Sequence, residues 1–337
     1  MALQIFKHIF RDIGIDLGTA NSIIYVNDRG FVLNQPSVIA YNHNKIFAIG
    51  DEAKKMMGKA HPHIRVVRPL ADGVISDFKA GEDMIKSYMQ QAGIPRFLIN
   101  KAVIGVPTGI TSVEKRAVVD SALAAGARKA FLIAEPMAAA IGLGLDVLGD
   151  HTHMIVDIGG GTTDIAIISY GGIVLDNTLR IAGDEMNEAL ISYFKNQHQL
   201  HVGLLTAEKI KIDFGTIDPE VEEDYFPVRG IDHQSRLPRE LLISNTVFEV
   251  ALQSVMNSIV ETIHQTLDEL PPELASDLID YGIVLTGGGA LLRGIDQYLR
   301  NRIKIPVNYP DNALFCVAEG TRRILQDMKK YKPLLSN

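Results

Sequence analysis

The fold of this chain is decided by Met154-Ile-Val-Asp-Ile-Gly-Gly-Gly-Thr-Thr-Asp-Ile-Ala-Ile-Ile168, which reads as two apolar strands joined by a glycine-rich turn. A similar order occurs near the start, in Ile13-Gly-Ile-Asp-Leu-Gly-Thr-Ala-Asn-Ser-Ile-Ile-Tyr-Val26. In each copy the first strand ends in Asp, the turn contains Gly and Thr, and the second strand is β-branched. One such segment alone would most often be an ordinary hairpin, because Gly and Thr suit turns and strands. Two copies in register indicate a duplicated fold.

The two turns combine residue types that bind a polyphosphate. A turn that is poor in side chains exposes backbone N–H groups to an anion, and Thr hydroxyls add further donors. The carboxylates of Asp16 and Asp157, one at each strand end, can serve a divalent cation or a water molecule. Two facing copies would therefore grip a nucleotide polyphosphate from both sides.

A third glycine turn follows another buried-type strand, in Tyr281-Gly-Ile-Val-Leu-Thr-Gly-Gly-Gly-Ala-Leu-Leu292. Backbone at residues 287–289 could approach a nucleoside closely, because no Cβ intrudes there. The spacing does not match the dinucleotide-binding fingerprint, and the Gly-Lys-Ser/Thr ending of a P-loop is missing. We expect this turn to face the nucleoside.

The composition excludes several classes of protein. The 337 residues are 47% hydrophobic, which is far from a disordered composition and suffices for two domains. A formal net charge of −7 without a basic cluster gives no reason to expect a nucleic-acid partner. The single cysteine, Cys316, lies in an apolar run and is expected to be buried, as fits a reducing compartment. No run of residues could span a bilayer and no secretory signal is recognisable, so we expect a cytoplasmic protein.

Strand and helix patterns alternate along the chain, which is typical of an α/β protein. Lobe I is expected at 1–145, with a small subdomain at about 32–68, and lobe II at 146–337, with a small insert at about 182–243. The last helix could pack back onto lobe I. The helices that we expect lie at about 80–92, 111–125, 246–268, 290–303 and 318–331.

Six motifs together carry a resemblance that covers nearly the whole chain. They are Asp16-Leu-Gly-Thr-Ala-Asn21, Pro69-Leu-Ala-Asp-Gly-Val-Ile-Ser-Asp-Phe78, Glu135-Pro-Met-Ala-Ala-Ala-Ile-Gly142, Asp157-Ile-Gly-Gly-Gly-Thr-Thr-Asp164, Ala207-Glu-Lys-Ile-Lys211 and Thr286-Gly-Gly-Gly-Ala-Leu-Leu292. The chain resembles the MreB/Mbl family of bacterial actins, within the superfamily of actin, sugar kinases and heat-shock chaperone ATPases. The resemblance implies an α/β, actin-like fold with two duplicated lobes around a nucleotide cleft. It also implies an ATP-binding filament protein that organises peptidoglycan synthesis and maintains rod shape.

The resemblance assigns roles to individual residues. The two phosphate turns would consist of Gly18, Thr19, Ala20 and Asn21, and of Gly159, Gly160, Gly161, Thr162 and Thr163. Asp16 and Asp157 would reach Mg²⁺, through water. Glu135 would orient the attacking water with the help of Thr162 and Asp157, in slow ATP hydrolysis coupled to the filament cycle. The nucleoside would contact Glu208, Lys211, Gly287, Gly288 and Gly289.

Two of these assignments have plain alternatives. Glu135 could instead be a strand-end carboxylate that caps the helix after Pro136. Glu208 and Lys211 share one helical face and could instead form a surface ion pair.

Two segments could touch a membrane. An apolar pattern at Ile5, Phe6, Ile9, Phe10 and Ile13 has helical spacing, although these residues could equally lead into the first strand. Family members bind membrane through an apolar loop at the place of Pro95-Arg-Phe-Leu-Ile99, which makes Phe97 and Leu98 candidates. The implied location is peripheral, on the inner face of the cell membrane. The implied partners are further copies of the chain and membrane proteins of the cell-wall elongation machinery.

Three other functions compete. A chaperone ATPase shares the first phosphate motif but needs a peptide-binding domain after it, whereas this chain ends at Asn337. A sugar kinase would need a substrate-activating Asp beside a sugar pocket, which the sequence does not reveal. An ATPase switch that does not polymerise remains open, because polymer contacts are not encoded in motifs. The insert also departs from the family pattern, with Ile231 and Arg236 in Gly230-Ile-Asp-His-Gln-Ser-Arg-Leu-Pro238.

Overall fold

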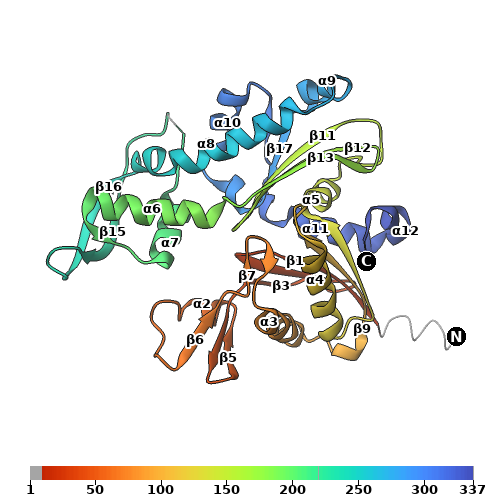
Figure 1. Ribbon diagram of the computed structural model, residues 1–337, viewed down its shortest axis with the longest axis horizontal. Coiled ribbons are helices and arrows are strands. Elements are labelled where there is room, and N and C mark those ends of the chain that lie inside the picture. The colour runs from red at the N-terminus through yellow and green to blue at the C-terminus, as the bar shows by residue number, and fades with distance from the viewer. Residues whose placement is uncertain (1–9, 219, 337) are drawn as a thin grey trace.

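The computed structural model describes residues 10–218 and 220–336 and contains two five-stranded sheets (Figure 1). The strands of the first sheet are β1 (Arg11–Leu17), β2 (Asn21–Val26), β3 (Gly30–Pro36), β9 (Ile99–Val106) and β10 (Lys129–Ala134). Those of the second sheet are β11 (His153–Ile158), β12 (Thr163–Ser169), β13 (Gly172–Leu179), β17 (Ile283–Thr286) and β18 (Val307–Asn308). Each sheet is the centre of one lobe.

The two sheets have the same topology. Their orders are β10-β9-β1-β2-β3 and β18-β17-β11-β12-β13. In both, three consecutive strands form an antiparallel meander, and the other two strands run parallel to its first strand. The first strand of each meander carries Asp16 or Asp157 close to its end, next to the turn. The duplication that the sequence indicates is therefore a duplication of structure.

Two helices from distant parts of the chain lie between the sheets (Figure 1). They are α5 (Glu135–Leu143) and α11 (Cys316–Gln326), whose buried faces share one cluster that includes Met137, Val317 and Ile324. Lobe I also holds α3 (Phe78–Gln91) and α4 (Ser112–Ala124), and the short η1 (Arg96–Leu98) lies between α3 and β9. Cys316 is buried, as expected.

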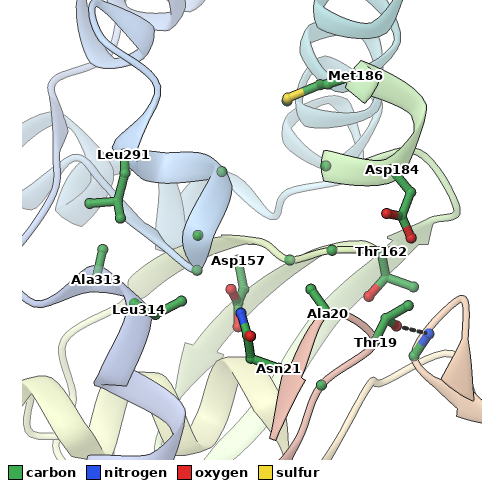
Figure 2. A pocket seen from close by; sticks show the side chains of 18 of the residues that line it. Thr19, Ala20, Asn21, Asp157, Thr162, Asp184, Met186, Leu291, Ala313 and Leu314 are labelled. Atoms are coloured by element: carbon green, nitrogen blue, oxygen red, sulfur yellow. Dashed lines mark hydrogen bonds between the residues drawn. The ribbon is translucent and has the colours of Figure 1, made fainter. Parts of the chain in front are cut away.

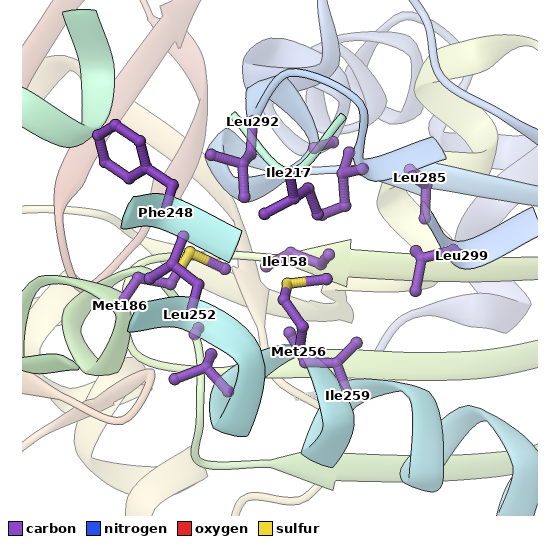
Figure 3. Packing of buried hydrophobic residues seen from close by; sticks show 14 of the residues in the cluster. Ile158, Met186, Ile217, Phe248, Leu252, Met256, Ile259, Leu285, Leu292 and Leu299 are labelled. Carbon is purple, nitrogen blue, oxygen red and sulfur yellow. The ribbon is translucent and has the colours of Figure 1, made fainter. Parts of the chain in front are cut away.

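The core of lobe II is built against the long helix α8 (Val247–Asp268). Phe248, Leu252, Met256 and Ile259 recur at helical spacing and pack against strand and loop residues such as Ile158 and Leu285 (Figure 3). This lobe also contains α6 (Gly183–His198), α7 (Leu204–Phe214), α9 (Pro272–Tyr281) and α10 (Ile295–Ile303).

Each lobe carries a smaller sheet, and the two small sheets lie on the same side of the molecule (Figure 1). In lobe I it is β5-β4-β6, followed by a β7–β8 hairpin, and in lobe II it is β14-β15-β16. Their bounds are β4 (Ile39–Asn42), β5 (Lys45–Ile49), β6 (Ile64–Val67), β7 (Leu70–Ala71), β8 (Val74–Ile75), β14 (Leu200–His201), β15 (Tyr225–Asp232) and β16 (Pro238–Ser244). The short helix α2 (Asp51–Lys54) follows β5.

The structure corrects two expectations about secondary structure and adds one helix. The helix expected at 290–303 is a 3₁₀ turn, η2 (Gly288–Leu291), then α10, because Gly294 between them is left-handed with φ 78°. The helix expected at 318–331 ends as α11 and restarts as α12 (Met328–Tyr331), where the Asp327 side chain caps the Lys330 N–H. Helix α9 was not expected.

The N-terminal apolar pattern does not continue as a helix into the described residues. Ile13 lies in β1 and is buried in the core of lobe I, so its inclusion in a membrane-binding helix was wrong. Phe10 packs under the Arg128 guanidinium, 4.0 Å from the ring centroid. Ile5, Phe6 and Ile9 lie outside the described residues. Across 10–218 and 220–336, no helix has the length and apolar character needed to cross a bilayer.

Candidate functional site

A cavity of about 370 Å³ lies between the lobes, where the turns of both meanders meet (Figure 2). It brings together most of the residues that the sequence singled out: Asp16, Gly18, Thr19, Ala20, Asn21, Glu135, Asp157, Gly159, Gly160, Thr162, Glu208, Lys211, Gly287, Gly288 and Gly289. Segments that are far apart in the sequence therefore form one site.

The first wall is the turn between β1 and β2. The Thr19 hydroxyl accepts a hydrogen bond from the Gly73 N–H at 2.8 Å, drawn dashed in Figure 2. The Gly18 carbonyl accepts from the Ser37 hydroxyl at 2.6 Å. These bonds fix the turn, and they leave the Thr19 hydroxyl proton free to donate.

The second wall is the turn between β11 and β12, which the start of α6 supports. The Gly159 and Gly160 carbonyls accept from the N–H groups of Gly183 and Asp184, at 3.2 and 2.7 Å. A Cβ on Gly160 would lie 2.8 Å from the Cβ of Ala20 in the opposite turn. Only glycine therefore lets the two turns approach this closely.

The third glycine turn covers the end of β11. Gly287 has φ 82°, and a Cβ there would collide with the Asp157 carboxylate. Leu291, Ala313 and Leu314 gather at one end of the cavity, with Asp157 and Asn21 near its middle and Asp184 at the other end (Figure 2). The cavity therefore has an apolar end and a polar end.

Three carboxyl groups, those of Asp16, Glu135 and Asp157, lie close to one another in the site. Burial raises the pKa of Asp16 to about 7. Burial and the neighbouring Asp164 and Asp16 raise the pKa of Asp157 to about 8. Burial, Asp164, Asp16 and Asp157 together hold the pKa of Glu135 well above its ordinary value. Such a cluster favours either bound protons or a bound cation.

The structure addresses both alternatives that the sequence left open. Glu135 is the first residue of α5, the structure records no side-chain cap at this helix start, and Glu135 lines the cavity. Glu208 pairs with Lys54 of lobe I, with Nζ and a carboxylate oxygen 2.8 Å apart. Lys211 donates to the Gly183 carbonyl at 2.6 Å, and burial lowers the pKa of its ammonium to about 8. Both residues line the cavity, and each has a partner other than its helix neighbour.

Two residues of the expected turns do not line the cavity. Thr163 is buried, and its hydroxyl donates to the Ile181 carbonyl at 2.8 Å, away from the site. Gly161 packs instead against lobe I, where a Cβ would lie 3.0 Å from the Asp72 nitrogen and from the Thr19 hydroxyl. Phe97 and Leu98 are not among the residues that line the cavity. Both lie in η1, where Phe97 is 73% exposed and Leu98 is half-buried.

Several lining residues were not expected. They are Ile23, Gly73, Gly183, Asp184, Met186, Asn187, Ile212, Leu291, Leu292, Ala313, Leu314 and Val317. The apolar members carry no chemical signature that the sequence could reveal. The Gly183-Asp184 pair was recognisable only as a helix start, and its place against the second turn depends on how α6 packs.

Ion pairs bridge the cleft beside the cavity, and besides the longer Arg180–Asp72 pair at 3.7 Å two of them are short. Lys54 of α2 meets Glu208 of α7, and Arg68 meets Asp184 at the start of α6 with nitrogen and oxygen 2.6 Å apart. Each pair joins a lobe I residue to a lobe II residue. They therefore hold the two lobes together at the edge of the site.

Two sheets of identical topology around an interlobe cavity, with both Asp-Gly-Thr turns in its walls, define an actin-like protein. The sequence profile described as MreB/Mbl protein matches residues 10–333. The chain is 43% identical over 323 residues to the cell shape-determining protein Mbl of Bacillus subtilis (strain 168), covering 95% of this chain and 97% of that protein. It is 42% identical over 333 residues to the cell shape-determining protein MreB of Escherichia coli (strain K12), covering 96% of each.

A solved structure is also similar. The crystal structure of MreB5 of Spiroplasma citri bound to AMPPNP superposes with a TM-score of 0.91 at 35% identity, covering 96% of this chain and 98% of that one. The same protein has also been solved bound to ADP. The chain belongs to the MreB/Mbl family, and it is an actin-like cytoskeletal protein whose relatives determine cell shape.

Proposed function

We propose that this chain binds Mg·ATP between its lobes, hydrolyses it slowly, and polymerises with itself on the inner face of the cell membrane. In this role it organises the membrane proteins of cell-wall elongation and maintains rod shape. The observation that carries the proposal is the cavity lined by both duplicated turns and by the third glycine turn. The volume of the cavity suits a nucleotide. The similar protein MreB5, which has the same fold, was solved with AMPPNP and with ADP.

The residues present fit an adenine nucleotide and Mg²⁺. The close approach of Gly160 to the opposite turn leaves backbone donors without side chains in the way, as phosphate oxygens require. Oxygen donors suit Mg²⁺, and Asp16 and Asp157 offer carboxylates from opposite lobes. Within the described residues no three His, Cys, Asp or Glu side chains are close enough to hold a metal ion by themselves. Water and phosphate oxygens would therefore complete the coordination.

Catalysis would rest on positioning. Glu135 and Thr162 line the cavity and would hold a water molecule for attack on the terminal phosphate. Bound Mg²⁺ would supply neutralisation of phosphate charge, and its charge beside Asp16 and Asp157 would favour their ionised forms. Asp157 would then help to orient the attacking water, from the side of the cleft opposite Glu135. Leu291 and Leu314 would cover the base at the apolar end.

Membrane binding would use the apolar loop at η1. Burial of Phe97 alone would contribute about 1.5–3 kcal/mol, which is weak for a single molecule. A filament that presents many copies would gain much more through avidity. Membrane binding should therefore depend on polymerisation, and polymerisation on nucleotide.

The test is sedimentation with Mg·ATP and anionic lipid vesicles, followed by electron microscopy of the pellet. Filaments on vesicles are expected for the wild type, and detached filaments for the Phe97→Ser/Leu98→Ser variant. Ile279→Ser, which removes an apolar side chain that is 70% exposed on α9, is the matched control. A protein that binds ATP yet stays monomeric under all conditions would refute the filament proposal and favour a non-polymerising ATPase switch.

A further inference from the structure

The insert of lobe II contains two histidine side chains that the nucleotide site does not use. His201 lies on β14, and His233 follows the end of β15, within the segment 230–238 that departs from the family pattern. The Nε2 atom of His201 and the Nδ1 atom of His233 are 2.7 Å apart, which makes a hydrogen bond between two imidazoles. His233 is exposed and His201 is half-buried, so solvent reaches the pair. Strands β15 and β16 of this insert lie at the left of Figure 1.

The two rings already have the separation of two ligands on one metal ion. Their centroids are 4.9 Å apart and their planes are inclined by 47°. Two imidazoles on one tetrahedral ion, with metal–nitrogen bonds of about 2.0–2.1 Å, have ring centres roughly 5 Å apart. The two facing nitrogens would have to move from 2.7 Å to roughly 3.3 Å apart. Small rotations about the side-chain bonds achieve this, because the pair is not packed in the core.

The backbone beneath the pair is held in place. Strands β14 and β15 pair antiparallel, and the His233 N–H donates to the Gln199 carbonyl at 2.8 Å. The Asp232 carboxylate fixes the turn that follows, because it accepts from the Ser235 N–H at 2.8 Å and from the Arg239 guanidinium at 2.9 Å. Ligands on a backbone that is already ordered lose little entropy when they bind an ion.

The chemistry of the pair suits a transition metal. Neutral imidazole nitrogens are common ligands of Zn²⁺, Cu²⁺ and Ni²⁺. In the hydrogen bond one nitrogen carries the proton and the other accepts it. When the ring that carries the proton adopts its other tautomer, both facing nitrogens offer lone pairs. Among the residues that the structure describes, no third His, Cys, Asp or Glu joins the pair, so water would complete the coordination.

We propose that His201 and His233 form a two-histidine site for a divalent transition-metal ion such as Zn²⁺, which ties β14 to the turn after β15. The ion replaces one hydrogen bond by two coordinate bonds and thereby stabilises the insert. Mg²⁺ does not compete, because it prefers oxygen ligands. The inference is independent of the proposed nucleotide site, since neither histidine lines the cavity between the lobes.

The test is calorimetric titration of Zn²⁺ into the untagged full chain without nucleotide, compared with His201→Gln and His233→Gln. Glutamine keeps a polar side chain and removes the imidazole. His63→Gln is the matched control, because His63 and His61 are also exposed and have ring centroids 4.9 Å apart. In that pair, however, the His61 Nδ1 atom accepts from the His63 backbone N–H, at 3.4 Å.

We expect the wild type to bind Zn²⁺, with an affinity that falls at least about 10-fold in either His201→Gln or His233→Gln and stays within about 2-fold in His63→Gln. Hydrogen exchange at residues 200–201 and 231–233 should slow when Zn²⁺ is added, and Mg²⁺ should have no such effect. If the wild type binds no Zn²⁺, or if both variants bind it as the wild type does, the site is refuted. An equal loss of affinity in His63→Gln would also refute it. If one variant fails to fold, the other decides.

Discussion

Lys54 and Arg68 each form an ion pair across the cleft, and removal of these pairs should speed the release of nucleotide. Neither residue lines the main cavity, so Lys54→Ala and Arg68→Ala leave the nucleotide contacts in place. Their partners, Glu208 and Asp184, belong to the opposite lobe and do line it. We expect the lobes to separate here before a bound nucleotide leaves.

The size of the effect follows from the exposure of the pairs. The side chains are 29% and 22% exposed in the Lys54–Glu208 pair, and 27% each in the Arg68–Asp184 pair. Fully exposed pairs contribute about 0.2–1 kcal/mol, and these partly shielded pairs should lie near the upper end. At about 1 kcal/mol each, one substitution should raise the dissociation rate about 5-fold and both together about 30-fold.

The assay is stopped-flow displacement of a fluorescent ATP analogue at 50 and 500 mM salt. Salt should speed release from the wild type more than from the double variant, because salt screens these two ion pairs, which only the wild type has. Lys55→Ala is the control, since Lys55, the residue after α2, pairs with Glu52 of the same lobe at 3.0 Å. Equal dissociation rates for the wild type and the double variant would refute the reasoning.

Three further predictions concern the site itself. The raised pKa values of Asp16 and Asp157, about 7 and about 8 against 3.8 for an ordinary Asp, mean that the folded state binds these protons more tightly than the unfolded chain. The stability that these bound protons give the folded state is therefore lost as the pH rises from about 4 to 8. Binding of Mg·ATP at pH 7.5 should release protons. Calorimetry in two buffers of different ionisation enthalpy measures this, and proton uptake would contradict the prediction. Glu135→Gln should slow hydrolysis about 100-fold without weakening nucleotide binding, and an unchanged rate in a phosphate-release assay would remove Glu135 from the mechanism. Gly160→Ala should weaken nucleotide binding about 10-fold, because its Cβ would press the two turns apart. Gly203→Ala is the control, since a Cβ at Gly203 meets nothing within 4 Å. Equal affinities of the two variants in a fluorescence titration would count against the close approach of the turns.

The sequence by itself determined the duplication and the turns that form the site. Anion binding by a turn is local chemistry, because it needs only glycine, exposed N–H groups and a carboxylate at the end of the preceding strand. Repetition of that pattern at Asp16 and Asp157 was therefore readable without coordinates, and the two matching sheets confirm it. The helix starts at Thr111 and Glu135 were readable for the same reason, since caps and Pro positions depend on neighbours in sequence.

Only the tertiary structure decided which members of a motif face the cavity. Thr162 and Thr163 are adjacent, yet one lines the site and the other bonds the Ile181 carbonyl, because Thr162 closes the turn, Thr163 begins β12, and successive side chains on extended backbone point to opposite sides. Glu208 finds its partner in Lys54 of the other lobe, although Lys211 is nearer in sequence. The hydrogen bond from the Thr108 N–H of lobe I to the Asp164 carboxylate of lobe II, at 3.2 Å, was equally invisible. Such pairs depend on how two lobes dock, and docking is set by the packing of whole cores such as α5 against α11, which no local pattern encodes.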